Sequence, residues 1–304
     1  MATNNMAEET VVQRSSIHRA REIVTALNRL DLGAADYAYL LARIGELIKG
    51  IPLQAATVRQ GTTLYRGVIY SNRPNDVCYL GYPPAHLVSN YQRCNGPGSP
   101  MFYCSVDNAA VFAELDAQPG DKVYLSKWTV TKEFFHFRIP PDTSDEFRAD
   151  AAFSKIETFL ETRFAQPIHD TYSEQYKLTA AITEKFSTGD LLGDAAILSG
   201  RVLGAVAYPS VAHTTRSDNV AIRPPVVDQC LQLTSVQEIE VVSRSGGSRE
   251  VRETDFSSDF AEGKINWAGR PGHWVLQPGE SLQFVVENGQ WVARKADGTV
   301  VDRT

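Results

Sequence analysis

Residues 62–70 read TTLYRGVIY, a run of aromatic and β-branched residues that predicts a β-strand. Arg66 stands inside this run and is followed by Gly67. A guanidinium placed in an apolar strand needs an anionic partner, because its desolvation is otherwise costly. The anion is either a ligand phosphate or a carboxylate of the protein itself; alternatively, Arg66 lies on the solvent face of the strand. The strand is therefore expected near the start of a folded domain, and Arg66 within it is the first candidate site residue.

A glycine-rich loop lies downstream of this strand. Residues 93–98 read RCNGPG, and their glycines let backbone amides approach a ligand closely. Arg93 at the start of the loop is long enough to reach a phosphate. The loop lacks the Lys-Ser or Lys-Thr pair of a Walker loop. An ordinary surface turn would have a similar composition. The loop therefore indicates a phosphate-binding site only in combination with other segments.

Two further segments each bring one polar group. Glu114 lies on a helix predicted over 109–115, with Ser105 as the expected N-cap, and its small neighbours leave room for a ligand. Ser210 ends an apolar strand predicted over 204–210, at a point where proline turns the chain. Taken singly, these residues are equally well explained as an exposed helix glutamate and a turn serine.

Together the four segments supply two arginines, one carboxylate and one hydroxyl. The guanidinium group of an arginine can bind two phosphate oxygens at once, through two parallel N–H donors. A carboxylate holds ribose hydroxyls and stabilises an oxocarbenium-like carbon. These are the groups that a nucleotide with a pyrophosphate and a labile glycosidic bond requires.

The rest of the sequence predicts an α+β fold without a regular βαβ rhythm. Apolar residues at helical spacing predict helices over 17–30 and 36–47, joined as a hairpin that packs on the same chain or binds a partner. Further helices are expected over 147–164 and 172–186. Strands are expected over 101–104, 122–131, 134–139, 219–222 and 231–242.

The C-terminal part has the pattern of a small β-meander. Asn288-Gly289 and Asp297-Gly298 are hairpin signals between short apolar strands over 282–286, 290–294 and 299–301. Trp267, Trp274 and Trp291 are expected to form the core of the meander. We therefore expect three parts: an N-terminal helical segment at 1–54, a catalytic domain at 55–244 and a β-rich extension at 245–304.

Composition, net charge and cysteine spacing limit the kinds of ligand and the cellular location that the sequence suits. The chain of 304 residues is 43% apolar and 22% charged, with a formal net charge of -6, which disfavours nucleic acid as a ligand. Its four cysteines form no CxxC pair and stand at no metal-ligand spacing, so reduced thiols and no metal site are expected. The polar start resembles no signal peptide, and no stretch is long enough for a membrane helix. A cytoplasmic protein is expected, although delivery into another cell needs no cleaved signal.

In their order and flanking residues, the four segments resemble the RES (Arg-Glu-Ser) domain family over roughly residues 58–242. The matching segments are Tyr65-Arg66, the loop from Arg93 to Pro100 with the strand Met101-Phe102-Tyr103, the helix with Ala110 and Glu114, the strand end Tyr208-Pro209-Ser210, and Asn219-Val220. The sequence departs from the family pattern at Gln92, where glycine is usual, and at Cys94, where an aromatic residue is usual. The stretch between Glu114 and Ser210 is also longer than usual.

The resemblance implies a split β-sheet like that of ADP-ribosyltransferases, with surrounding helices and a cleft that binds NAD. It implies a toxin-like enzyme, an NAD glycohydrolase or NAD phosphorylase, that cleaves the nicotinamide–ribose bond. NAD is then a substrate, and no cofactor is expected. An antitoxin or immunity protein is the implied protein partner, and a homo-oligomer is left open.

The resemblance also implies roles for individual residues. Arg66 and Arg93 would grip the NAD phosphates, and Glu114 would bind the ribose hydroxyls and stabilise positive charge. Ser210 would orient the ribose or the attacking water or phosphate, and Tyr103 would pack on the nicotinamide. The expected catalytic residues are Glu114, Ser210 and Arg66. The expected substrate-binding residues are Arg66, Arg93, Tyr103, Asn95, Tyr208 and Asn219.

Three other functions remain open from the sequence. The same groups suit a protein ADP-ribosyltransferase, which differs in the acceptor of the ADP-ribose. A catalytically idle nucleotide- or partner-binding module would use the helical hairpin and meander as interaction surfaces. A structural protein of a phage or secretion particle has no positive support. The joint presence of Arg66, Arg93, Glu114 and Ser210 favours an enzyme, because an idle module has no chemical need for all four.

Overall fold

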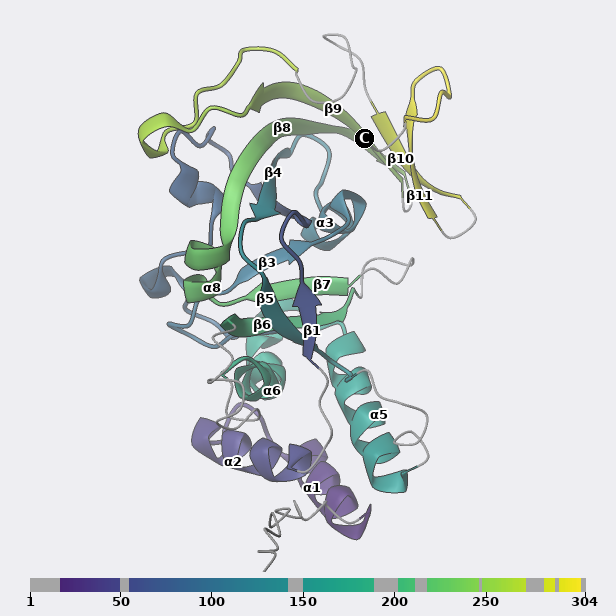
Figure 1. Ribbon diagram of the computed structural model, residues 1–304. Coiled ribbons are helices and arrows are strands. Elements are labelled where there is room, and N and C mark those ends of the chain that lie inside the picture. The colour runs from purple at the N-terminus through teal and green to yellow at the C-terminus, as the bar shows by residue number, and fades with distance from the viewer. Residues whose placement is uncertain are drawn as a thin grey trace, which may run out of the picture.

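The computed structural model describes residues 17–49, 55–141, 150–188, 202–210, 218–245, 248–271, 282–287 and 290–301. Within these ranges the protein is α+β, with eleven strands in one sheet and helices packed against it (Figure 1). The helices are α1 (Ile17–Arg29), α2 (Tyr37–Ile48), α3 (Asn108–Leu115), α5 (Ala151–Ala165), α6 (Lys177–Ser187) and α8 (Pro224–Cys230), with 3-10 helices η1 (Val77–Leu80), η2 (Ala85–Leu87), η3 (Asp170–Tyr176) and η4 (Ala261–Gly263). The strands are β1 (Ala55–Val58), β2 (Thr63–Ile69), β3 (Phe102–Ser105), β4 (Lys122–Val130), β5 (Phe134–Arg138), β6 (Val202–Pro209), β7 (Asp218–Ile222), β8 (Leu231–Ser245), β9 (Ser248–Ser257), β10 (Leu282–Glu287) and β11 (Gln290–Lys295).

The sheet has two halves that meet at one point. Its order is β1-β5-β6-β7-β3-β2-β4-β8-β9-β10-β11, and the described pairs are antiparallel apart from β5 with β6. Among the described residues, β2 and β3 share one register pair, Tyr65 with Ser105. By contrast, β2 pairs with β4 along its whole length, and β3 does so with β7. The two halves therefore diverge between β2 and β3.

The predicted helical hairpin is present and packs on the same chain. Asp36 caps α2 by accepting a hydrogen bond from the Tyr39 amide at 2.8 Å, as a helix N-cap does. The apolar faces of α1 and α2 share a hydrophobic cluster with α5, α6, β5 and β6. Figure 1 shows these four helices gathered beside the β1-β5-β6 part of the sheet. The segment predicted as 1–54 thus contributes to the same core as the following region.

Gly67 brings α3 close to β2. A Cβ at this position would lie 2.5 Å from Val111 Cγ1 and 2.7 Å from Leu115 Cδ1, well inside normal contact distance. The missing side chain therefore lets the helix lie directly on the strand. The N-cap of α3 is Asp107, whose side chain accepts from the Ala109 amide, so the prediction of Ser105 as cap was wrong. Ser105 is instead the last residue of β3, where strand pairing fixes its backbone.

The C-terminal strands extend the main sheet. β8 pairs with β9 across the boundary expected at 244/245, with two register shifts along the way, and β10 and β11 follow through β9. The third strand expected at 299–301 is an isolated bridge between Arg294 and Val300. Trp267 packs on Tyr124 of β4, with ring centroids 5.9 Å apart, and not in a separate meander core. Trp274 and the side chain of Trp291 lie outside the described residues.

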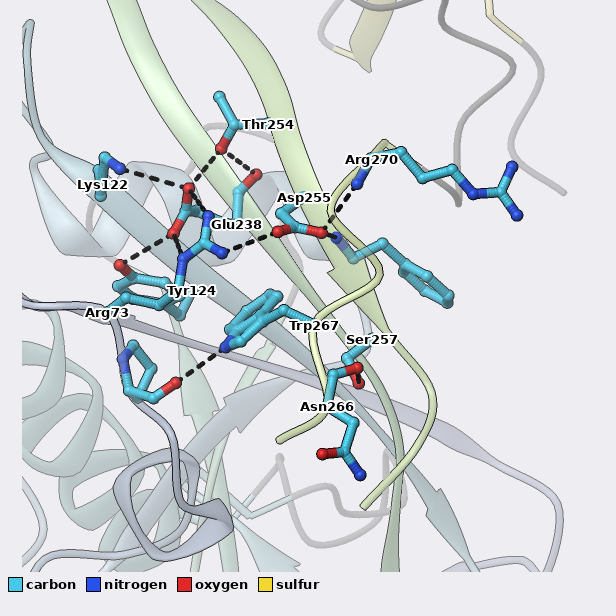
Figure 2. Close-up of polar contacts among 12 residues, drawn as sticks. Arg73, Lys122, Tyr124, Glu238, Thr254, Asp255, Ser257, Asn266, Trp267 and Arg270 are labelled. Carbon is cyan, nitrogen blue, oxygen red and sulfur yellow. Dashed lines mark hydrogen bonds and ion pairs between the residues drawn. The ribbon is translucent and has the colours of Figure 1, made fainter. Parts of the chain in front are cut away.

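A charge network around two buried carboxylates ties the loop after β2 to β8 and β9, in the same half of the sheet as β2 (Figure 2). Arg73 binds Glu238 of β8 at 2.7 and 2.8 Å and Asp255 of β9 at 2.8 Å. Both carboxylate residues are almost completely buried. Lys122 and Thr254 also bind Glu238, and the guanidinium of Arg73 stacks 5.0 Å from the Trp267 ring. The loop is therefore anchored to β8 and β9 by charge-assisted bonds.

The remaining sequence predictions agree with the structure to within a few residues, with four exceptions. The strands β1 and β9 and the helix α8 were not expected. The helix predicted over 172–186 divides into η3 and α6, with non-helical backbone at Tyr172. Asp150 caps α5 by accepting hydrogen bonds from the Ala152 and Phe153 amides. None of the helices in the described ranges is long and apolar enough to cross a membrane.

Candidate functional site

A pocket of about 760 Å³ opens where the two halves of the sheet diverge. It is lined by β2 from Arg66 to Ile69 and the following Tyr70, by β3 at Tyr103 and Cys104, and by α3 at Val111, Glu114 and Leu115. Six of the predicted site residues line it: Arg66, Arg93, Tyr103, Glu114, Tyr208 and Asn219. Its size is typical of pockets that take small molecules. Folding thus brings into one cavity groups that are more than 150 residues apart in the sequence.

Arg66 is a half-buried cation held by uncharged partners. Its Nε donates to the Gly81 carbonyl at 3.1 Å and its Nη1 to the Tyr103 carbonyl at 3.0 Å. Its guanidinium also lies 5.2 Å from the centre of the Phe102 ring. Burial lowers the pKa of Arg66, but an arginine stays charged at neutral pH. Within the described part of the chain no carboxylate neutralises it, so its remaining N–H groups are suited to an anion in the pocket.

Arg93 is a second cation of the same kind. Its Nη1 donates to the carbonyls of Phe164 and Gln166, and its guanidinium lies 5.3 Å from the Tyr176 ring centre. Tyr103 connects it to Arg66: the Tyr103 carbonyl accepts from Arg66, while its hydroxyl accepts from the Cys94 amide at 3.0 Å. Tyr103 therefore helps to fix the spacing between the two guanidinium groups.

Glu114 is held by two donors on the opposite half of the sheet. Its Oε1 accepts hydrogen bonds from the Ser210 hydroxyl and, at 2.8 Å, from the Asn219 amide. Asn219 lies on β7 and is buried, whereas Glu114 is exposed and lines the pocket. Ser210 is not one of the lining residues, and it contacts the site by donating a hydrogen bond to Glu114. The carboxylate is thus oriented through Oε1, while Oε2 accepts no hydrogen bond from the part of the chain that the structure describes.

Two further predicted residues form the wall around this site. Asn95 is buried behind the lining, where its Oδ1 accepts from the Tyr103 hydroxyl, so it meets a ligand only through Tyr103. Tyr208 is buried beside Phe164, with ring centroids 5.9 Å apart, and is one of the residues that line the pocket. Burial raises the pKa of both Tyr103 and Tyr208 well above the ordinary value, so both hydroxyls are neutral.

The pocket also contains residues that the sequence did not single out. Burial raises the pKa of the Cys104 thiol, which excludes it as a thiolate nucleophile at neutral pH. Tyr91 and Tyr176 form much of the wall beyond Arg93. Tyr91 stands two residues before Arg93 and could have been noticed for that reason. Tyr176 reaches the pocket from a distant helical region, and no local pattern marks it.

The arrangement combines two cations that lack a carboxylate partner in the described chain with one oriented carboxylate. This suits a ligand with negative charge at one part and a centre that gains positive charge at another. Within the described residues no group of three histidine, cysteine, aspartate or glutamate side chains could hold a metal ion. Neither a scan against protein-family models nor a search of curated proteins finds a match to this sequence.

Proposed function

We propose that the protein cleaves the nicotinamide–ribose bond of NAD, by hydrolysis or phosphorolysis. The observation that carries the proposal is the shared pocket of Arg66, Arg93 and the oriented carboxylate of Glu114. The two guanidinium groups would bind the pyrophosphate, whose charge they complement. The resemblance of the same residues to the RES family supports this assignment, and with it a toxin-like role opposed by an antitoxin or immunity protein.

In the proposed reaction the C–N bond between nicotinamide and ribose breaks, and nicotinamide leaves with the bonding electron pair. The ribose carbon gains positive charge, which the carboxylate of Glu114 would stabilise electrostatically. An oxygen of water or phosphate then bonds to that carbon, and water releases its proton to solvent. Ser210 and Asn219 act as positioning residues, because both donate to the same oxygen of Glu114.

The divergence of β2 from β3 supports a finer description of the fold. A sheet that splits around a ligand pocket is the arrangement expected of ADP-ribosyltransferase-like folds. Here Arg66 lies on one half of the sheet and Asn219 on the other, with the pocket between them. We propose that the catalytic region is a variant of this fold, enlarged by α5 and α6.

The proposal is tested by incubating the purified protein with NAD, with and without phosphate. Nicotinamide with ADP-ribose would identify hydrolysis, and ADP-ribose 1″-phosphate would identify phosphorolysis. Transfer of labelled ADP-ribose to protein would identify a protein ADP-ribosyltransferase instead. A folded protein that releases no nicotinamide at high enzyme concentration would refute the proposal.

A further inference from the structure

The pocket continues past Arg93 into a second wall that the proposed chemistry does not use. This aromatic wall, as we name it, consists of Asn90, Tyr91 and Gln92 from the loop after η2, with Tyr176 at the end of η3. It lines the same cavity as Glu114. A ligand bound at Arg66 and Arg93 can therefore extend along it.

Both rings of the aromatic wall are half-buried and fixed in place. Lys177 Nζ lies 5.4 Å from the centre of the Tyr91 ring, and the Tyr37 ring packs on the same tyrosine at 5.8 Å. The Tyr176 ring lies against the Arg93 guanidinium, and its hydroxyl donates to the Ile168 carbonyl at 3.3 Å. Rings held in this way lose little freedom when a ligand packs on them, which favours binding.

The support behind Tyr91 is itself anchored. Lys177 is buried, donates to the carbonyls of Gly33 and Ala35 at 3.4 Å each, and pairs with Glu174 at 2.9 Å. The turn between α1 and α2 therefore holds the ammonium group that faces the Tyr91 ring. The N-terminal hairpin thus stabilises one side of the pocket.

The chemistry of the aromatic wall fits a planar heteroaromatic base. Aromatic side chains stack on bases, and side-chain amides both donate to and accept from base edges. Asn90 and Gln92 are exposed and supply such amides beside the rings. Arg93 contacts Tyr176 of the wall and lines the same pocket as Glu114, so its guanidinium can bind the pyrophosphate that joins the two halves of a dinucleotide.

We propose that the aromatic wall binds the adenine end of a dinucleotide, with Tyr91 and Tyr176 as its stacking residues. This inference rests on the proposed function for the identity of the dinucleotide. By itself, the inference predicts a binding subsite for a nucleoside diphosphate. Such a ligand contains the base and the two phosphates but not the nicotinamide–ribose bond.

The test uses the full chain and calorimetric binding of ADP and of inorganic pyrophosphate. Tyr91→Leu and Tyr176→Leu should each weaken ADP binding by about 10-fold, as expected for the loss of a stacked ring. Pyrophosphate has no base, so its affinity should fall much less. Tyr91→Leu leaves the Arg93 contact with Tyr176 intact, which separates loss of stacking from displacement of the arginine. With NAD as substrate, both variants should raise KM more than they lower kcat.

Tyr172→Leu is the matched control, because Tyr172 lies on the same 3-10 helix as Tyr176 but is 65% exposed and outside the pocket. Thermal unfolding of each variant checks that the fold is retained. The inference is overturned if the unchanged protein does not bind ADP, or if the folded variants bind ADP as tightly as the unchanged protein. If ADP binding depends on both tyrosines but NAD releases no nicotinamide, the subsite stands and the proposed function fails. If nicotinamide is released while the variants keep the original ADP affinity and KM, the proposed function stands and the subsite is refuted.

Discussion

At the scale of single residues, the proposed chemistry depends most on the carboxylate of Glu114. Ser210 and Asn219 would donate equally well to an amide oxygen, so Glu114→Gln keeps these contacts and removes the charge. We expect kcat for nicotinamide release to fall by roughly 10²–10³-fold, the usual effect of losing one well-placed electrostatic group. The KM should change much less, because the ground-state ribose carries no full charge.

Steady-state kinetics with quantified nicotinamide checks this expectation. Glu161→Gln is a suitable control, since Glu161 is an exposed glutamate of the helix α5. Near-normal turnover of Glu114→Gln would mean that Glu114 is an ordinary surface glutamate.

Arg66 has an observed structural role and a proposed role in ligand binding, and one substitution can separate the two. Arg66→Ala removes a charge-assisted contact to an anion, which should cost about 1.5–3 kcal/mol in binding of ADP or NAD. It also leaves the Gly81 and Tyr103 carbonyls without their donor, which should lower the free energy of unfolding by about 1–3 kcal/mol. Calorimetry and urea unfolding measure the two effects independently, with the exposed Arg59→Ala as control. Weaker stability with unchanged affinity in the folded protein would make Arg66 purely structural.

At the scale of elements, the placement of α3 on β2 sets the position of Glu114 relative to Arg66. In Gly67→Ala the new methyl group would overlap Val111 and Leu115, so the helix must move away from the strand. We expect a loss of about 1–3 kcal/mol in stability, as for other overpacked cores, together with a marked fall in activity.

Adding Val111→Ala removes the closest clashing atom, so the double variant should recover part of the activity. Gly45→Ala in α2 is the control, because a Cβ there meets its nearest neighbour at an ordinary 3.7 Å. Unchanged activity in Gly67→Ala would show that α3 tolerates displacement.

The sequence predicted those elements whose own residues determine them. The pattern of residues 62–70 was sufficient for β2, and Asp36 with its following apolar positions was sufficient for α2. β9 is rich in charged residues and is a strand because β8 pairs with it, which no local pattern reveals. α8 spans only two turns, too short for a visible period.

The candidate site follows the same rule. The segments around Arg66, Arg93, Glu114 and Asn219 were recognisable in order, and the structure brings these residues together. The donation from Ser210 to Glu114 depends on tertiary geometry and could not be deduced from either residue's neighbours. The same is true of Tyr176, whose ring reaches the pocket through the packing of η3. The role of each residue in NAD cleavage stays a prediction.

At the scale of the whole molecule, the network around Glu238 makes stability depend on acidity. Burial alone would raise the pKa of Glu238, but Arg73, Thr254 and Lys122 together lower it from 4.5 to about 2. Because the folded-state pKa is below the unfolded-state value, this stabilisation is fully present above about pH 4.5. It is lost as the pH falls toward 2, and amounts to on the order of 3 kcal/mol.

Urea unfolding between pH 7 and pH 3 tests this dependence. Glu238→Gln should lower stability at pH 7 and flatten the decline below pH 4.5. Glu240→Gln, a half-exposed neighbour on the same strand, should leave the decline in place. An equally steep decline in Glu238→Gln would assign the acid sensitivity to other carboxylates.

Because Tyr65 and Ser105 form the single register pair between β2 and β3 in the described residues, we expect the sheet to bend most readily at this point, as a hinge. The bonds from Ser210 and Asn219 to Glu114 and from Arg66 to the Tyr103 carbonyl already join the two halves, and we expect a ligand that contacts both Arg66 and Asn219 to strengthen this coupling. Native-state hydrogen exchange should therefore show separate opening of the two halves in the free protein, with different free energies. When ADP is bound, amides of β2 and of β3 should slow together by a similar factor. Slowing on one side alone would mean that the ligand rests on that half without closing the hinge.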